Sequence, residues 1–240
     1  MGTSRIPPEF RFTVNILKDL SLASFDNAKQ LIKEANLLLK NDHLARAYFL
    51  SVAAIEEVGK AYLCFESSER NLSDSAITSK IIKSIESHSN KINAAFHASI
   101  LTSKDPKGAV EKALDLMIAL KNGREPSMYT DINYIESKIY TPHYVIRDVA
   151  AKDSVRLAEY CNFTTRHYIN NNEPSEKSKV DDAVFGLKAN VFSNLIKKED
   201  FWWYLIDCFE NNKVNTNKII LGYHNEYGRK NKLFRVSDAN

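Results

Sequence analysis

The chain has 240 residues, of which 44% are hydrophobic and 26% are charged, as is typical of a globular protein with one domain and an appendage. Its 7 glycines and 6 prolines are too few for an all-β fold with many tight turns. The formal net charge of +3 permits contact with nucleic acid without requiring it.

The first predicted helix follows an N-terminal arm of residues 1–12. Apolar residues recur every three or four positions from about Thr13 to Lys40. Ser21 or Ser24 would divide this helix in two if either served as an N-cap. A short turn at 41–42 then leads into the next helix, so the two helices are expected to pack antiparallel.

The stretch 43–65 predicts one long, mostly buried helix. Its apolar residues fall in one arc, and Arg46, Glu57 and Lys60 fall together on the other side. Gly59 lies within the apolar arc, where a mid-helix glycine costs about 1 kcal/mol relative to alanine, so we expect it to permit a close helix crossing. An ordinary Glu-Lys pair one turn apart also explains the polar side.

A third helix is predicted over about 75–103, with His88 and Lys91 one turn apart at the margin of its apolar side. A boundary histidine beside a lysine that reaches to solvent explains this pair without any function.

The fourth helix is predicted over about 106–121 and is expected to end with Gly123 at the C′ position. Its expected buried stripe is Val110, Ala113, Leu114, Met117 and Ile118. The mixed polar and aromatic stretch that follows, 124–131, is too irregular for a helix, and an extended or hairpin segment is expected over 128–140. This region is either a functional loop or a surface crossover whose tyrosines pack on the bundle.

A basic fifth helix is predicted over about 145–170 and completes a bundle of residues 13–172. Residues 173–181 are polar and read as a linker, and 182–240 form a C-terminal extension. Within the extension, 199–210 predicts a short aromatic helix that must pack on the bundle or on a second copy of the chain. The fold class is therefore all-α, with about five long antiparallel helices.

Several classes of site are disfavoured. The three cysteines are far apart, and the six histidines lack HxxxH or HExxH spacing, so we expect no disulfide, no metal and no cofactor. The chain contains no apolar run of about 18 residues and no signal-peptide core near its start, which predicts a cytoplasmic protein away from membranes.

Three pieces of the sequence together resemble the AbiV family of bacterial abortive-infection proteins. They are ARAYFLSVAAIEEVGKA within 45–61, the H-x-x-K of His88 to Lys91, and the segment from Arg124 to Tyr129 and Asp131. The resemblance covers roughly residues 13–170, the size of one domain. It implies defence against phage by arrest of translation, a phage-encoded activator protein, and kinship with HEPN helical bundles, many of which are dimeric, metal-independent ribonucleases. In this chain no arginine is followed by histidine after four to six residues, so the usual HEPN signature is missing.

A substitute site follows as a hypothesis. Its members would be Glu57, Lys60, His88, Lys91 and Arg124, meeting in one cleft between neighbouring helices and a loop. His88 would act as acid and base, the cations would hold the phosphate, and Glu57 would orient His88 or a lysine or serve as a second base. Alternatively, the same residues form a buried ion-pair network that only fixes helix pairing.

Contacts to RNA are expected from three further residues, Arg46, Tyr129 and Asp131, with Tyr129 stacking on an unpaired base. The sequence does not decide between a metal-independent endoribonuclease and a protein that binds a phage or ribosomal partner without cutting RNA. A purely structural helical partner that dimerises through its aromatic tail is a third interpretation. The HEPN resemblance implies a homodimer with the site near its two-fold axis.

Overall fold

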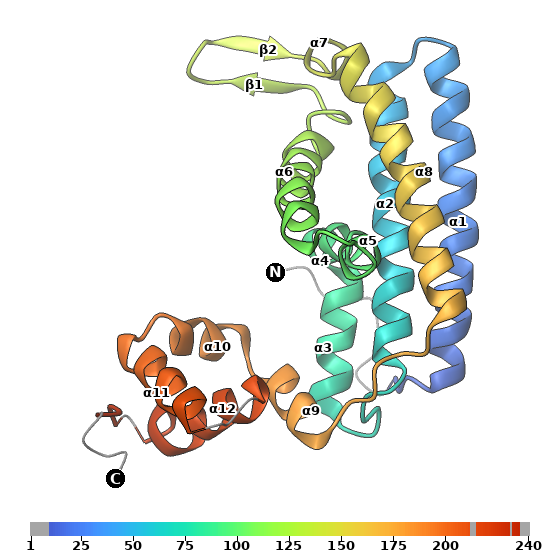
Figure 1. The fold of residues 1–240 in the computed structure, drawn as a ribbon. Coiled ribbons are helices and arrows are strands. Elements are labelled where there is room, and N and C mark those ends of the chain that lie inside the picture. Colours follow the sequence, from blue (N-terminus) through green and yellow to red (C-terminus); the bar gives the residue numbers. More distant parts are fainter. Residues whose placement is uncertain (1–9, 212–214, 231, 236–240) are drawn as a thin grey trace. The chain divides into compact units, whose positions relative to one another are not determined.

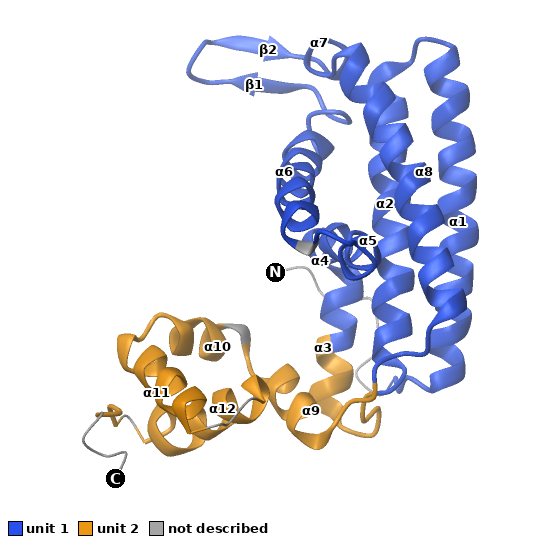
Figure 2. Cartoon of the chain, viewed as in Figure 1, with its two compact units in different colours: residues 1–69, 81–175 blue, residues 70–80, 176–240 orange. Residues whose placement is uncertain are grey.

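The computed structural model describes residues 10–211, 215–230 and 232–235, so most of the predicted N-terminal arm lies outside the described residues. The chain divides into two compact units, each described here by itself. They comprise residues 1–69 with 81–175, and residues 70–80 with 176–240 (Figure 2).

The larger unit is built mainly of helices and also contains a short hairpin. Its elements, with part of α3 in the smaller unit, are α1 (Val14–Lys40), α2 (Leu44–Ser67), α3 (Ser75–Glu86), α4 (His88–Ala94), α5 (His97–Leu101), α6 (Pro106–Arg124), β1 (Asp131–Asn133), β2 (Lys138–Tyr140), α7 (Pro142–Val145) and α8 (Asp148–Asn171). Strands β1 and β2 pair antiparallel, with Ile132 opposite Ile139, which confirms the hairpin expected over 128–140.

The core of this unit lies around α2, which packs against both α1 and α8 (Figure 1). Val52, Ile55 and Val58 are fully buried in α2, as its apolar arc predicts. The predicted break in α1 does not occur, because the buried Ser21 hydroxyl donates a hydrogen bond to the Ala61 carbonyl of α2 at 2.9 Å. Helix α1 is therefore continuous, and Thr13 caps it through a bond from the Ile16 amide.

The single helix predicted over 75–103 is wrong, because the segment forms three short helices, α3, α4 and α5. Ser87 is the reason for the first break. Its hydroxyl accepts a hydrogen bond from the Asn90 amide at 3.3 Å and so caps α4, which begins at His88. Hydrophobic periodicity runs through such a break without revealing it.

Helix α6 ends later than predicted, and most of its predicted buried side is exposed. It continues through Gly123, which is helical and lies against the Tyr48 ring, and ends at Arg124. The buried stripe predicted for α6 is wrong in most positions, since Ala113 is buried but Val110, Leu114 and Ile118 are each about half exposed. The apolar stripe of α6 therefore faces outward.

The smaller unit contains α9 (Lys179–Gly186), α10 (Ala189–Ile196), α11 (Glu199–Glu210), α12 (Thr216–Tyr223) and a π-helical turn (His224–Gly228). Helix α11 has the bounds that the sequence predicts. Its buried side, including Phe201, packs in a cluster with Tyr223 and Phe234. A capping box between Ser178 and Asp181 begins α9 inside the stretch that reads as a linker.

The close crossing predicted at Gly59 is confirmed. A Cβ atom at this position would overlap the backbone carbonyl of Lys91, so α4 crosses α2 at backbone distance. Glycine is needed here because any side chain would push α4 away from α2.

We expect Gly59→Ala to destabilise the protein by about 1–3 kcal/mol, because the added methyl group meets rigid backbone rather than a flexible side chain. Urea unfolding would measure the loss. Gly186→Ala is the matched control, since its Cβ would meet the Ile77 side chain at an ordinary 3.6 Å. Equal stability of the two variants would contradict the close crossing.

Candidate functional site

A buried carboxylate lies at the centre of the candidate site. Glu56, on α2, is only 5% exposed. Its Oε2 atom accepts from the Lys91 Nζ at 2.9 Å and lies 2.6 Å from the His88 Nδ1, while its Oε1 atom accepts from the Arg124 Nε at 2.8 Å. Groups from α4 and α6 therefore meet on one side chain of α2.

The close crossing at Gly59 explains how α4 reaches Glu56. Glu56 and Gly59 are one turn apart on α2, so the helix that crosses Gly59 also passes the carboxylate. Because α4 begins at His88, that residue and Lys91 are likewise one turn apart and present both nitrogens to Glu56.

A second glycine contact explains how Arg124 reaches the same carboxylate. The Tyr48 ring lies where a Cβ of Gly123 would be, and the Tyr48 hydroxyl donates to the Ala119 carbonyl at 3.3 Å. These contacts hold the end of α6 against α2. Arg124, expected in a loop, is the last residue of α6, and its guanidinium lies 5.8 Å from the centre of the Phe49 ring.

The charges around Glu56 keep it ionised. Burial by itself would raise the pKa of Glu56, but hydrogen bonds from Lys91 and His88, together with their positive charges, outweigh burial and lower it. The carboxylate is therefore charged at neutral pH, and the cations around it outnumber it.

His88 combines a fixed ring with access to solvent. Its side chain is 55% exposed, while that of Lys91 is 10% and that of Arg124 is 22% exposed. A carboxylate next to Nδ1 favours the tautomer with the proton on that nitrogen, which leaves Nε2 with a lone pair. This is the form in which an imidazole accepts a proton from a substrate.

Glu57 and Lys60 do not join this cluster through the contacts seen in the described residues. They pair with each other at 2.5 Å, one turn apart on α2, with side chains 16% and 22% exposed. The sequence predicts Glu57 and Lys60 in one site with His88, Lys91 and Arg124. In the structure His88, Lys91 and Arg124 contact Glu56 instead. Sequence reasoning missed Glu56, and the available signal was its position one turn before Gly59.

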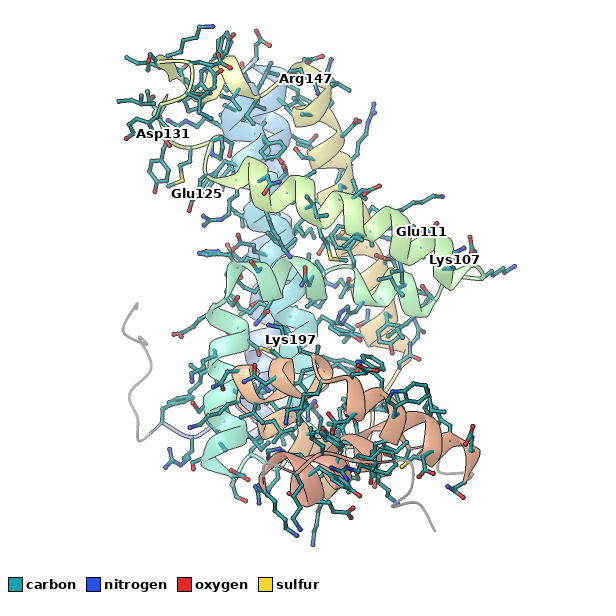
Figure 3. All side chains as sticks on the ribbon, turned by 90° about the vertical axis from the view of Figure 1, so that its left-hand side faces the viewer. Lys107, Glu111, Glu125, Asp131, Arg147 and Lys197 are labelled. Carbon is teal, nitrogen blue, oxygen red and sulfur yellow. The ribbon has the colours of Figure 1, made fainter. Side chains whose placement is uncertain are left out.

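The three residues expected to contact RNA are all exposed. Arg46 lies in the first turn of α2, Tyr129 is 56% exposed between α6 and β1, and Asp131 begins β1 at the hairpin (Figure 3). The hydrogen bonds of the described residues do not connect them to Glu56. The Asp131 Oδ1 instead accepts from the Ile132 amide at 2.7 Å.

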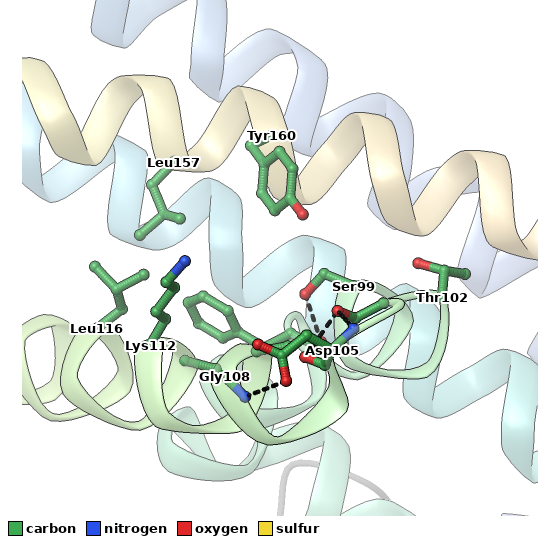
Figure 4. Close-up of a pocket in the computed structure, with 12 residues that line it drawn as sticks. Ser99, Thr102, Asp105, Gly108, Lys112, Leu116, Leu157 and Tyr160 are labelled. Atoms are coloured by element: carbon green, nitrogen blue, oxygen red, sulfur yellow. Dashed lines mark hydrogen bonds between the residues drawn. The ribbon is translucent and has the colours of Figure 1, made fainter.

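A cavity of about 540 Å³ lies apart from this cluster, between α5, α6 and α8 (Figure 4). Three of its hydroxyl groups donate to nearby carbonyls, Ser99 to Phe96, Thr102 to Ala98 and Ser103 to Asp105. Asp105 accepts from the Gly108 amide and so caps α6. These groups are already paired, so the cavity is a weaker candidate for chemistry than the Glu56 cluster.

Comparison with known families identifies the bundle. A HEPN-type family model described as AbiV matches residues 16–162, which is more than half of the chain. The chain belongs to the AbiV family. Membership places it among abortive-infection proteins and confirms the predicted all-α HEPN-like bundle. The match includes Glu56, His88, Lys91 and Arg124, whereas α9 to α12 lie beyond it.

No curated protein and no solved structure matches this AbiV-family chain. In the described ranges, no helix is both long enough and apolar enough to cross a membrane. The same residues contain no group of three or more His, Cys, Asp or Glu side chains placed to hold a metal ion.

Proposed function

We propose that this AbiV-family protein arrests translation in phage-infected bacteria by cleaving RNA without a metal ion. The observation that supports the proposal is the convergence of His88, Lys91 and Arg124 on the buried Glu56, with the His88 ring left more than half exposed. A network that served packing alone would have no need to leave an imidazole, which can both accept and donate a proton, open to solvent.

The chemistry begins at the 2′-hydroxyl of RNA. The Nε2 atom of His88 accepts its proton, the 2′-oxygen bonds to the adjacent phosphorus, and the bond from phosphorus to the 5′-oxygen breaks. The protonated ring then returns the proton to the leaving 5′-oxygen. The products are a 2′,3′-cyclic phosphate and a 5′-hydroxyl, so protons and electrons balance without any cofactor.

The other members of the cluster have different roles. Arg124 uses Nε for Glu56, and its guanidinium carries four further N–H donors suited to a phosphate and to the charge that develops on it. Lys91 is buried, so it acts mainly by holding Glu56 ionised, and Glu56 orients His88. Lys60 and Glu57 are paired with each other on α2 and carry no net charge as a pair, so they have no direct part in the proposed cleavage.

The assembly and its trigger belong to the same proposal. The HEPN resemblance supports a homodimer as the working form, and the AbiV resemblance supports activation by a phage-encoded protein. Exposed Arg46, Tyr129 and Asp131 extend the surface that RNA would meet, with the Tyr129 ring able to stack on an unpaired base.

A second candidate function is sequestration of a ribosomal or phage factor. The exposed apolar side chains of the hairpin favour it, because Tyr134 is 84% and Ile135 is 95% exposed. Such an inhibitor would stop growth while every RNA stayed intact.

Mapping of RNA ends separates the two functions. After induction in bacteria, we expect new 2′,3′-cyclic phosphate ends in messenger, transfer or ribosomal RNA within the time that growth stops. Cells carrying the empty vector control for background decay. Growth arrest with unchanged RNA ends would exclude cleavage and favour the binding function.

A further inference from the structure

Helix α11 carries a stripe of large apolar side chains that its own unit leaves uncovered. Trp202 and Trp203 are each 49% exposed, Phe209 is 47% and Ile206 is 45% exposed. The opposite side of α11 is buried in the smaller unit through Phe201 and Cys208. The stripe is therefore a second apolar face of α11, about half exposed and opposite the side that packs in the unit.

Acidic residues stand at both ends of this stripe. Glu199, Trp202, Ile206 and Glu210 follow one another at intervals of three or four residues, so they share one side of the helix. Both glutamates are exposed, and Glu199 also accepts a hydrogen bond from the Trp203 indole at 3.3 Å. The two glutamates favour a partner helix that offers cations at the same two ends of its apolar stripe.

Helix α6 carries the complementary pattern. Val110, Leu114 and Ile118 are 47%, 54% and 49% exposed, and Lys107 and Lys121 lie at the two ends of that line. Figure 3 shows Lys107 and Glu111 at the outer end of α6, pointing away from the helices behind it. Lys107 makes a long 3.8 Å contact to Glu111, in which both side chains are exposed.

We propose that α6 of one copy of the chain packs against α11 of a second copy. Apolar side chains would meet along the middle of both helices, and a lysine would meet a glutamate at each end in either orientation. At 1.5 Å per residue the lysines are roughly 21 Å apart and the glutamates roughly 16 Å, a difference that flexible lysine side chains cover.

The size of the two stripes fits a dimer. Each half-exposed aromatic side chain offers on the order of 100 Å², since a fully buried one covers about 150–250 Å², and each aliphatic side chain offers less. A two-fold dimer makes the contact twice, so each copy would bury both of its stripes, on the order of 500–700 Å². Stable interfaces bury about 800 Å² per partner.

The proposal rests on the homodimer of the proposed function and names the surface that forms it. Sedimentation equilibrium of the full chain, without RNA, tests it through the dissociation constant of the dimer. Three charge variants are compared: Lys107→Glu with Lys121→Glu, Glu199→Lys with Glu210→Lys, and all four changes together. Lys29→Glu with Lys33→Glu on the exposed side of α1 is the control for a change of charge elsewhere.

We expect each double variant to weaken the dimer about tenfold or more, because like charges then face each other, and the fourfold variant to regain wild-type affinity. The control is expected to leave the affinity unchanged. A wild-type chain that stays monomeric, or a fourfold variant that does not recover, would overturn the proposal. Neither result depends on RNA cleavage, so the nuclease proposal stands or fails on its own experiments.

Discussion

Replacing His88 by alanine is expected to abolish growth arrest and to lower RNA cleavage about 10²–10⁴-fold, the usual contribution of a general acid–base group. The ring is the exposed member of the Glu56 cluster, and its Nδ1 is already held by the carboxylate at 2.6 Å. Growth after induction and the rate of appearance of cyclic phosphate ends measure the two effects.

Two observations make this experiment decisive. His143→Ala is the matched control, because that histidine is exposed on α7 and lies outside the hydrogen bonds described for the cluster. Circular dichroism must show that the His88 variant is folded, which we expect because more than half of its side chain is exposed. A folded His88→Ala protein that still cleaves RNA and stops growth would remove the catalytic proposal.

Periodicity in the sequence was sufficient for the helices that bury one side. It gave α1, α2 and α11 nearly to their observed ends, because each of them presents a clear apolar face to a neighbour. It failed at Ser87, where a local cap breaks a continuous apolar line, and at Val110 and Leu114, where the apolar line faces outward. Spacing shows that a helix has an apolar side, but not what covers that side.

The same limit explains which site residues the sequence could supply. The sequence places His88 and Lys91 at the margin of an apolar helix side and Arg124 in a loop segment that resembles AbiV, and the structure brings the three together. The helical wheel points to Glu57, which lies on the polar side with Lys60, and not to Glu56. A carboxylate buried among Lys91, Arg124 and the His88 ring runs against that rule, and only the packing of α4 and α6 on α2 makes it stable.

Removing the Glu56 carboxylate is expected to cause the largest loss of stability of any change considered. Glu56→Ala leaves Lys91, and in part Arg124, as buried cations without a counter-charge, and breaking such a cluster costs about 3–5 kcal/mol. Glu56→Gln should cost less, because the amide oxygen still accepts one hydrogen bond. Urea unfolding at neutral pH measures both losses.

The neighbouring carboxylate is the control for this prediction. Glu57→Gln breaks the ion pair with Lys60. This pair lies nearer the surface, so its loss should lower the free energy of unfolding by only about 0–1 kcal/mol. Glu56→Gln and Glu57→Gln both replace a carboxylate by an amide, at adjacent positions of α2. Equal losses at 56 and 57 would contradict the assignment of Glu56 as the centre of the cluster.

Acid gives an independent measurement of the same contact. The pKa of Glu56 is lower in the folded chain than its ordinary value of about 4.3, so the charged carboxylate stabilises the fold fully above that pH. This contribution is lost as pH falls through the folded pKa, where the proton returns to Glu56 beside His88, Lys91 and Arg124. The stability gap between wild type and Glu56→Gln should therefore be constant at neutral pH and shrink below about pH 4. A gap that persists unchanged in acid would mean that the lost stability comes from packing of the side chain and not from its charge.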